Sequence, residues 1–222
     1  MSATAVLPLP TRRAASYLPL KRSLDVAVAV MVLAWLAPVW GAIALAIALD
    51  SPGGVLFRQR RLGRGRRPFT MYKFRTMHVG ADDAFHRQAV ARWARGTPCQ
   101  VDGRSAYKPE RDPRVTRVGR FLRLTGLDEV PQLLNVLRGD MSLVGPRPAI
   151  PYELEHYRPW YHRRFVVKPG ITGLWQVNRH LAPSLEEAMA LDLAYVRRMS
   201  LRLDLEVLAR TVPLVLGKRL SF

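Results

Sequence analysis

The feature that most restricts the fold is an uncharged, apolar run over residues 26–49. As one straight helix, at about 1.5 Å per residue, it would reach roughly 36 Å, more than the ~30 Å hydrocarbon core of a membrane. Pro38 lies at its midpoint, where a proline removes a backbone hydrogen bond and kinks a helix. Each half then reaches only about 18 Å, which is too short to cross a membrane alone.

Basic residues flank this run on both sides. They are Arg12, Arg13, Lys21 and Arg22 before it, and Arg58, Arg60, Arg61, Arg64, Arg66 and Arg67 after it. Because basic flanks stay on the cytoplasmic side of a membrane, the pattern favours a re-entrant helix that enters, breaks near Pro38 and returns to the same face. A spanning helix stays open as an alternative. A buried core helix would show a polar face, which this run lacks, and the apolar stretch of a signal peptide is shorter, although Ala46-Ile47-Ala48 resembles a cleavage site.

Length and composition suit one domain with a membrane attachment. The 222 residues are 49% apolar, which is enough for a core, and the net charge of +18 indicates polyanionic partners: nucleic acid, anionic lipid or phosphorylated ligands. We expect a flexible N-terminal arm over residues 1–20, the re-entrant helix over residues 21–50 and a catalytic domain over residues 51–222 at the cytoplasmic face. The single cysteine, Cys99, excludes an intrachain disulfide and fits a reducing compartment.

The remaining pattern predicts an α+β fold: a membrane-embedded re-entrant helix, a small β-hairpin and several interfacial amphipathic helices. Strands are expected at residues 55–61 and 69–75, helices at 81–95 and 115–124, a loop at 96–113 and helix from Ser184 onward. The last helix carries an apolar stripe beside basic residues, so it either lies on a membrane surface or packs on the core.

Asp128 and Glu129 are the strongest chemical signal. They stand at a predicted helix start, capped by Thr125 or Asp128, and that helix ends at Gly139. Arginines precede the pair at every third position, at Arg111, Arg114, Arg117, Arg120 and Arg123. A carboxylate pair among guanidinium groups suggests phosphoryl chemistry with a divalent metal. Read alone, the two acids could equally be ordinary helix-capping residues.

Further basic and glycine-rich segments accompany the pair. Lys73 and Arg75 share one face of the second predicted strand, the turn Gly145-Pro146-Arg147-Pro148 aims Arg147, and residues 168–173 form a second rigid turn before Gln176.

Together these segments resemble the bacterial sugar transferase family, the monotopic phosphoglycosyl transferases, in its minimal form. The resemblance covers about residues 20–215. It is carried by Lys21-Arg22-Ser23-Leu24-Asp25 before the broken run, by Tyr72-Lys73-Phe74-Arg75-Thr76-Met77, by the long motif over residues 127–148 and by Lys168-Pro169-Gly170-Ile171-Thr172-Gly173.

The resemblance implies a reaction and its partners. A sugar 1-phosphate passes from a nucleotide diphosphate sugar to polyprenyl (undecaprenyl) phosphate, the first membrane step of polysaccharide or glycoconjugate synthesis. It implies Asp128 as a nucleophile that forms a covalent intermediate, and Glu129 as the ligand of Mg²⁺. The expected phosphate- or substrate-binding residues are Lys73, Arg75, Arg123, Arg147 and Gln176. It also implies a monotopic protein on the cytoplasmic face of the bacterial inner membrane, in contact with anionic lipids, with a homodimer left open.

Two other classes of function would fit parts of the sequence. The charge alone would fit a nucleic-acid-binding protein, but the chain carries no recognised nucleic-acid-binding motif, so no nucleic-acid partner is expected. A catalytically silent membrane scaffold would keep the re-entrant helix and tolerate loss of Asp128 and Glu129.

Overall fold

The computed structural model describes residues 12–96, 100–101, 104–105, 112–178 and 184–216. Within these residues the fold is mostly helical with three small two-stranded sheets, which confirms the α+β class. Cys99, Arg111, Arg179 and His180 lie outside the described residues.

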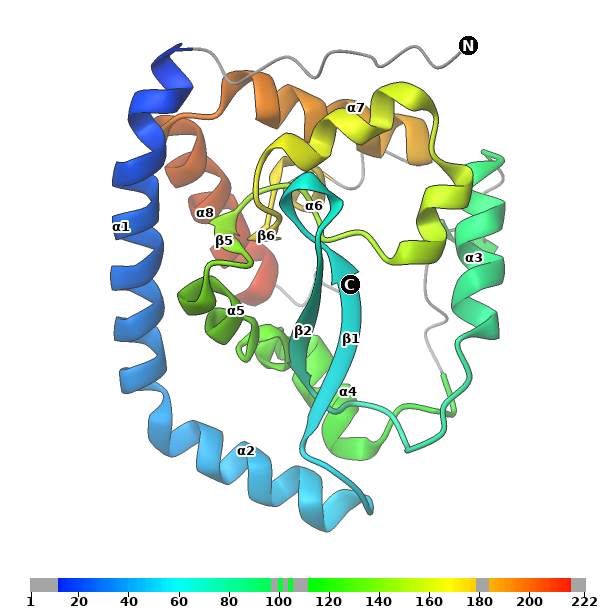
Figure 1. Cartoon of the computed structure of the whole chain (residues 1–222). Helices are drawn as coiled ribbons and strands as arrows, with labels where there is room; N and C mark the ends of the chain where they lie inside the picture. Colours follow the sequence, from blue (N-terminus) through cyan, green and yellow to red (C-terminus); the bar gives the residue numbers. More distant parts are fainter. Residues whose placement is uncertain (1–11, 97–99, 102–103, 106–111, 179–183, 217–222) are drawn as a thin grey trace.

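The helices and strands follow each other along the chain as Figure 1 shows. The α-helices are α1 (Arg12–Trp35), α2 (Ala37–Asp50), α3 (Ala84–Ala94), α4 (Arg117–Thr125), α5 (Gln132–Arg138), α6 (Leu174–Val177), α7 (Leu185–Arg198) and α8 (Leu201–Leu216). The strands are β1 (Leu56–Leu62), β2 (Pro68–Phe74), β3 (Gln100–Val101), β4 (Arg104–Ser105), β5 (Ser142–Val144) and β6 (Gly170–Thr172). In the described part of the chain, 3-10 helices join them at η1 (Arg64–Arg66), η2 (Leu127–Glu129), η3 (Pro151–His156) and η4 (Pro159–Val166).

Helices α1 and α2 form a bent pair along one side and the bottom of the molecule in Figure 1. The two axes meet at 64°, and Pro38 lies in the first turn of α2, where its missing N–H ends the helical hydrogen bonding of α1. Among the described residues no single helix is long and apolar enough to cross a membrane, whereas this bent pair meets that criterion jointly. The predicted break at Pro38 is therefore confirmed. Helix α1 begins at Arg12, so residues 12–20, expected to be a flexible arm, are helical.

The inner side of this helix pair packs on β2, α4 and α5. Ala29 of α1 joins a buried cluster with Met71 and Val136, and Ile47 of α2 joins another with Phe74 and Leu122. Other apolar side chains of the pair point outward: Trp35 is 80% exposed, Leu49 79%, Met31 63% and Leu45 62%. The pair thus buries one side in protein and leaves an apolar side uncovered.

Strands β1 and β2 form the predicted hairpin, which runs through the middle of the molecule (Figure 1). The strands are antiparallel, Leu56 pairing with Phe74 and Leu62 with Pro68, so each differs from its predicted bounds by one residue. The turn between them needs the left-handed backbone of Gly65, whose φ is 66°. The hairpin therefore carries Tyr72 and Lys73 toward the end of β2 farthest from that turn.

Asn135 fastens α5 to the free edge of β2. Its side chain is completely buried, and its Oδ1 accepts the N–H of Tyr72 at 3.1 Å while its Nδ2 donates to the carbonyl of Thr70 at 2.7 Å. One amide side chain thus pairs with β2 as a neighbouring strand would. Helix α5 ends at Gly139 with φ 88°, as predicted.

The two glycine-rich turns of the sequence lie against each other. β5 and β6 are parallel, the N–H of Gly145 donates to Thr172 and that of Gly170 donates to Pro146, both at 2.9 Å. A Cβ on Gly145 would lie 2.6 Å from the carbonyl oxygen of Lys168, so only glycine permits this approach. Segments that the sequence presents separately are therefore one structural unit.

Three expectations need refinement. The helix predicted from Ser184 onward is interrupted after Arg198, giving α7 and α8. The apolar stripe of α8 divides, because Leu208 packs on the core while Leu205 and Val212 are more than half exposed. The predicted loop over residues 96–113 contains the short strands β3 and β4 in its described part.

We expect Asn135→Ala to destabilise the protein by about 2–4 kcal/mol, because it leaves the Tyr72 N–H and the Thr70 carbonyl without their partner. A thermal melt in detergent measures the effect. The control is Gln88→Ala on the exposed side of α3, for which little change is expected. Equal melting temperatures for the two variants would show that the contact of Asn135 with β2 contributes nothing to stability.

Candidate functional site

Asp128 and Glu129 lie in the 3-10 helix η2, between α4 and α5. Gly126, with φ 70°, ends α4 and begins η2, and the following N–H groups bond three residues back. The acids are therefore not in the first turn of α5, which begins at Gln132 with Pro131 as its N-cap and has no side-chain cap. The predicted capping by Thr125 or Asp128 is wrong; the hydroxyl of Thr125 donates to carbonyls of α4 instead.

Glu129 is held from two sides. One carboxylate oxygen accepts from the ammonium of Lys73 at the end of β2, and the other accepts from the side-chain amide of Gln132. Its side chain is 14% exposed and that of Lys73 is 21% exposed, so solvent screens this ion pair only in part. The hairpin and α5 together orient the acid.

Asp128 is more deeply placed, with only 8% of the residue exposed. The guanidinium of Arg123 lies near Asp128. Burial lowers the pKa of Arg123, and the negative charges of Asp128 and Asp112 oppose that shift. The Nε of Arg123 donates to the hydroxyl of Thr76 at 2.9 Å, which fixes the guanidinium beside the end of β2. Four of the residues expected from the sequence, Lys73, Arg123, Asp128 and Glu129, therefore gather around β2, α4 and η2.

Arg75 binds the protein's own backbone. Its guanidinium donates to the carbonyls of Ser51, at 2.7 Å, and of Pro52, just after α2. Only 7% of the residue is exposed. These contacts tie the end of the bent helix pair to β2, next to Lys73.

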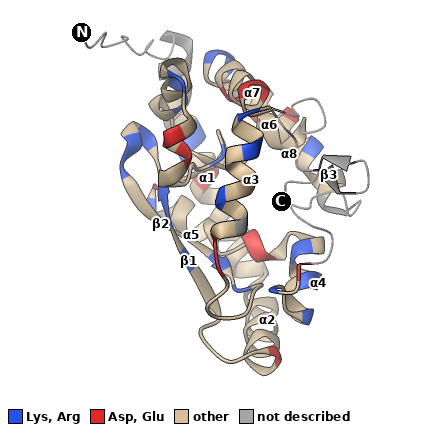
Figure 2. Ribbon diagram, turned by 90° about the vertical axis from the view of Figure 1, so that its right-hand side faces the viewer, with Lys and Arg blue, Asp and Glu red and all other residues tan. Residues whose placement is uncertain are grey.

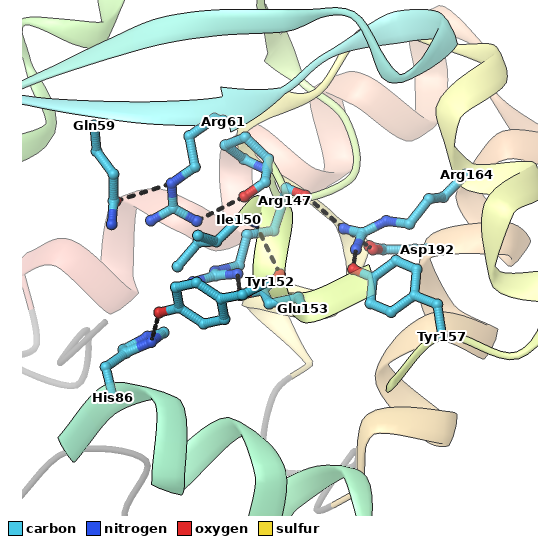
Figure 3. A network of polar contacts seen from close by, with 11 residues as sticks. Gln59, Arg61, His86, Arg147, Ile150, Tyr152, Glu153, Tyr157, Arg164 and Asp192 are labelled. Carbon is cyan, nitrogen blue, oxygen red and sulfur yellow. Dashed lines mark hydrogen bonds and ion pairs between the residues drawn. The ribbon is translucent and has the colours of Figure 1, made fainter. Parts of the chain in front are cut away.

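Arg147 belongs to a second, buried polar cluster, drawn in Figure 3. Its Nη1 donates to Glu153 at 3.0 Å, and the other oxygen of Glu153 accepts the N–H of Ile150 at 3.1 Å. Arg164 donates to the backbone carbonyl of Arg147 and pairs with Asp192 of α7 at 2.6 Å. Both the side chain and the backbone of Arg147 are thus held by buried charged groups, Glu153 and Arg164.

Gln176 lies in α6, against the paired turns. It is 6% exposed, and its Nε2 donates to the carbonyl of Ile171 at a long 3.4 Å. Its Oε1 has no hydrogen-bond partner among the described residues and lies 2.6 Å from where a Cβ on Gly173 would be. A buried amide oxygen without a partner costs free energy, which a bound donor group would recover.

Several residues of these clusters escaped the sequence analysis. Gln132 lies three residues after Glu129, a helical spacing that could have revealed it. Thr76, Glu153 and Asp192 are brought in by long-range folding, and nothing in the local sequence distinguishes them.

The donor set around Glu129 fits Mg²⁺ held together with a substrate. Among the described residues no three histidine, cysteine or acidic side chains form a metal cage. Magnesium, however, is commonly bound through one or two carboxylates plus substrate phosphates and water. The adjacent carboxylates of Asp128 and Glu129 are donors of this type, and Lys73 already shows that Glu129 pairs with a cation.

Comparison with known proteins gives a consistent answer. A family model described as bacterial sugar transferase matches residues 16–218. The chain is 43% identical over 205 residues to the UDP-glucose:undecaprenyl-phosphate glucose-1-phosphate transferase of Caulobacter vibrioides, covering 88% of this chain and 69% of that protein. It is 36% identical over 203 residues to the exopolysaccharide production protein ExoY of Sinorhizobium fredii, covering 91% and 88%.

Other relatives are much longer. The chain is 40% identical over 201 residues to the UDP-glucose:undecaprenyl-phosphate glucose-1-phosphate transferase of Escherichia coli, and the match covers 87% of this chain but 39% of that protein. The chain belongs to the bacterial sugar transferase family, which confirms the class of phosphoglycosyl transferase expected from the sequence.

Asp192 gives the buried cluster a pH-dependent signature. Burial raises its pKa to about 6, against the opposing charges of Arg164 and Arg147. From about pH 4 to pH 6 Asp192 therefore keeps its proton in the folded protein but releases it in the unfolded chain. The contribution of Asp192 to the free energy of unfolding consequently declines as pH rises through this range, by at most about 3 kcal/mol. We expect the melting temperature of the wild type, relative to Asp192→Asn, to be higher near pH 4 than above pH 6. A difference that does not change with pH would contradict this assignment.

Proposed function

We propose that the protein transfers a sugar 1-phosphate from a nucleotide diphosphate sugar to undecaprenyl phosphate. The products are a polyprenyl-diphosphate sugar and a nucleoside monophosphate. The observation that carries the proposal is the pair of largely buried acids, Asp128 and Glu129, beside Lys73 and Arg123. The names of the relatives from Caulobacter vibrioides and Escherichia coli support the same reaction.

In the first step Asp128 acts as the nucleophile. One of its carboxylate oxygens attacks the phosphorus that bears the sugar, and the bond from that phosphorus to the oxygen of the nucleoside phosphate breaks. The nucleoside monophosphate leaves, and the sugar phosphate stays on Asp128 as an acyl phosphate. In the second step an oxygen of undecaprenyl phosphate attacks the same phosphorus and frees the carboxylate.

The cationic side chains make an attack by one anion on another feasible. Lys73 and Arg123 place positive charge beside the acids, where it offsets the charge of the phosphate oxygens. Glu129 would hold Mg²⁺, which supplies further neutralisation of the diphosphate when bound. Lys73 then exchanges its contact with Glu129 for one with the substrate.

The remaining expected site residues have supporting parts in this proposal. Arg147, which Glu153 and Arg164 hold in place, binds phosphate oxygens. Gln176 accepts a hydrogen bond from a sugar or nucleotide hydroxyl through its side-chain carbonyl oxygen. Arg75 contributes by fixing the end of β2 to the segment after α2 rather than by binding phosphate itself.

The bent helix pair is proposed to enter the membrane and return to the same face. Its exposed apolar residues, Trp35 and Leu49 among them, would then face lipid on both sides of the break at Pro38. The protein would be monotopic on the cytoplasmic face of the bacterial inner membrane. The excess of basic residues, which Figure 2 shows spread over the hairpin, α3 and α4, would favour anionic lipids. A homodimer stays an untested prediction.

Asp128→Asn is expected to lower transfer by on the order of 10³-fold or more, because an amide cannot serve as the nucleophile. Release of nucleoside monophosphate from UDP-glucose, the donor in the names of two relatives, measures turnover. Intact-protein mass spectrometry without acceptor should detect a sugar-phosphate adduct on the wild type only. The control, Asp83→Asn, changes an exposed acid at the start of α3. Full turnover by Asp128→Asn would refute the nucleophile assignment.

Topology is tested separately. Single cysteines placed at Ser16, before the bend, and at exposed Gly54, after it, are expected to react with an impermeant thiol reagent from the same side of sealed inverted membrane vesicles. Labelling from opposite sides would mean that the helix pair spans the membrane.

A further inference from the structure

Two neighbouring cavities lie at the turn end of the hairpin, outside the Asp128–Glu129 site. The first, of about 260 Å³, is lined by the first half of α1, by β5, and by residues 166–168. The second, of about 500 Å³, is lined by residues 63–65 and 67–69 of the hairpin turn and by Gly139 and Asp140. Arg64 and Lys168 line both cavities and therefore mark their junction.

The charges at this junction are poorly compensated. Within the described part of the chain, the side chains of Arg64 and Lys168 make no hydrogen bond or ion pair, although the backbone carbonyl of Arg64 accepts the N–H of Arg67. Arg22, which also lines the first cavity, donates to the carbonyls of Val136 and Leu137 at the end of α5. A Cβ on Gly139 would lie 3.4 Å from the ammonium of Lys168 and 3.7 Å from a guanidinium nitrogen of Arg22, so these two cations converge on one point.

The environment of Lys168 reflects this crowding. Burial lowers its pKa, and the positive charges of Arg22 and Arg64 lower it further, while Asp25 and Asp140 oppose the shift. Two carboxylates thus face three cations, Arg22, Arg64 and Lys168, and each carboxylate also accepts a neutral donor: Asp25 the N–H of Leu143 and Asp140, weakly, the amide of Asn135. Cations held together in this way favour a bound anion.

Much of the wall of the first cavity is apolar, although Lys21 and Asp25 also line it. Beyond its charged mouth it is bordered by Leu18, Val144, Val166, Val167 and Met199. The second cavity is bordered instead by glycines, Arg67 and Asp140, beside Pro68 and Phe69. A ligand that fits both cavities would have an anionic group at their junction and a hydrocarbon part in the first cavity.

We propose that these cavities form a second binding site, which takes a phosphate-bearing amphiphile. Its phosphate lies between Arg64 and Lys168, where the arginine can form a paired hydrogen bond, and its hydrocarbon part follows the apolar wall of the first cavity. Membrane phospholipid and prenyl phosphate share this chemistry. The site differs from the transfer site, because it lies at the hairpin turn rather than at the Lys73 end of β2.

The test measures protection of Lys168 from acetylation in the full chain carrying Asp128→Asn, so that its result does not depend on turnover. The probes are farnesyl phosphate, dihexanoylphosphatidylglycerol and farnesol, and peptide mass spectrometry follows Lys168 relative to the other lysines. We expect either phosphate amphiphile to slow modification at least tenfold and farnesol to have no such effect. The more protective phosphate identifies the source. No protection, or equal protection by farnesol, would overturn the site.

A matched pair of variants then tests the junction. Arg64→Gln removes one exposed arginine that lines both cavities, and Arg58→Gln removes one exposed arginine of β1 that lines neither. Because both side chains are exposed, neither change should disturb the fold. We expect protection to weaken at least fivefold in Arg64→Gln and to persist in Arg58→Gln. Equal protection in both variants would remove Arg64 from the site.

Discussion

The structure depends on holding two carboxylates, those of Asp128 and Glu129, in a largely buried place. Asp128 and Glu129 can stay there only if cations lie beside them, and those cations come from other elements, Lys73 from β2 and Arg123 from α4. The elements β2, α4 and η2 must therefore keep fixed positions relative to one another. Asn135 sets the position of α5 on β2, and the close contact of Gly119 in α4 with the backbone of Thr76 sets that of α4.

The bent helix pair takes part in the same arrangement. Its inner side completes the apolar clusters under β2, α4 and α5, and its end is tied to β2 through Arg75. These contacts hold the helix pair and the strand that carries Lys73 in one fixed arrangement.

The sequence predicted the parts of this fold that depend on local chemistry. The break at Pro38, the hairpin and the helix end at Gly139 follow from proline, alternation and glycine, which act within a few residues. It could not show that the two glycine-rich turns pair with each other, or that Glu153 and Asp192 surround Arg147, because those contacts join segments far apart along the chain. The capping of α5 was mispredicted since Pro131 displaced the helix start to Gln132.

The arginines fall into two groups, those that bind the chain's own backbone and those that do not, and composition does not distinguish them. Arg22, Arg75 and Arg164 donate to backbone carbonyls of their own chain, where the several N–H groups of a guanidinium satisfy helix ends and turns. Such groups have little capacity left for a ligand. An arginine count therefore overstates the phosphate-binding surface, and the relevant cations are those whose partners are side chains or solvent. By that criterion the proposed transfer site would rely on Lys73, Arg123 and Arg147, and the proposed second site on Arg64 and Lys168.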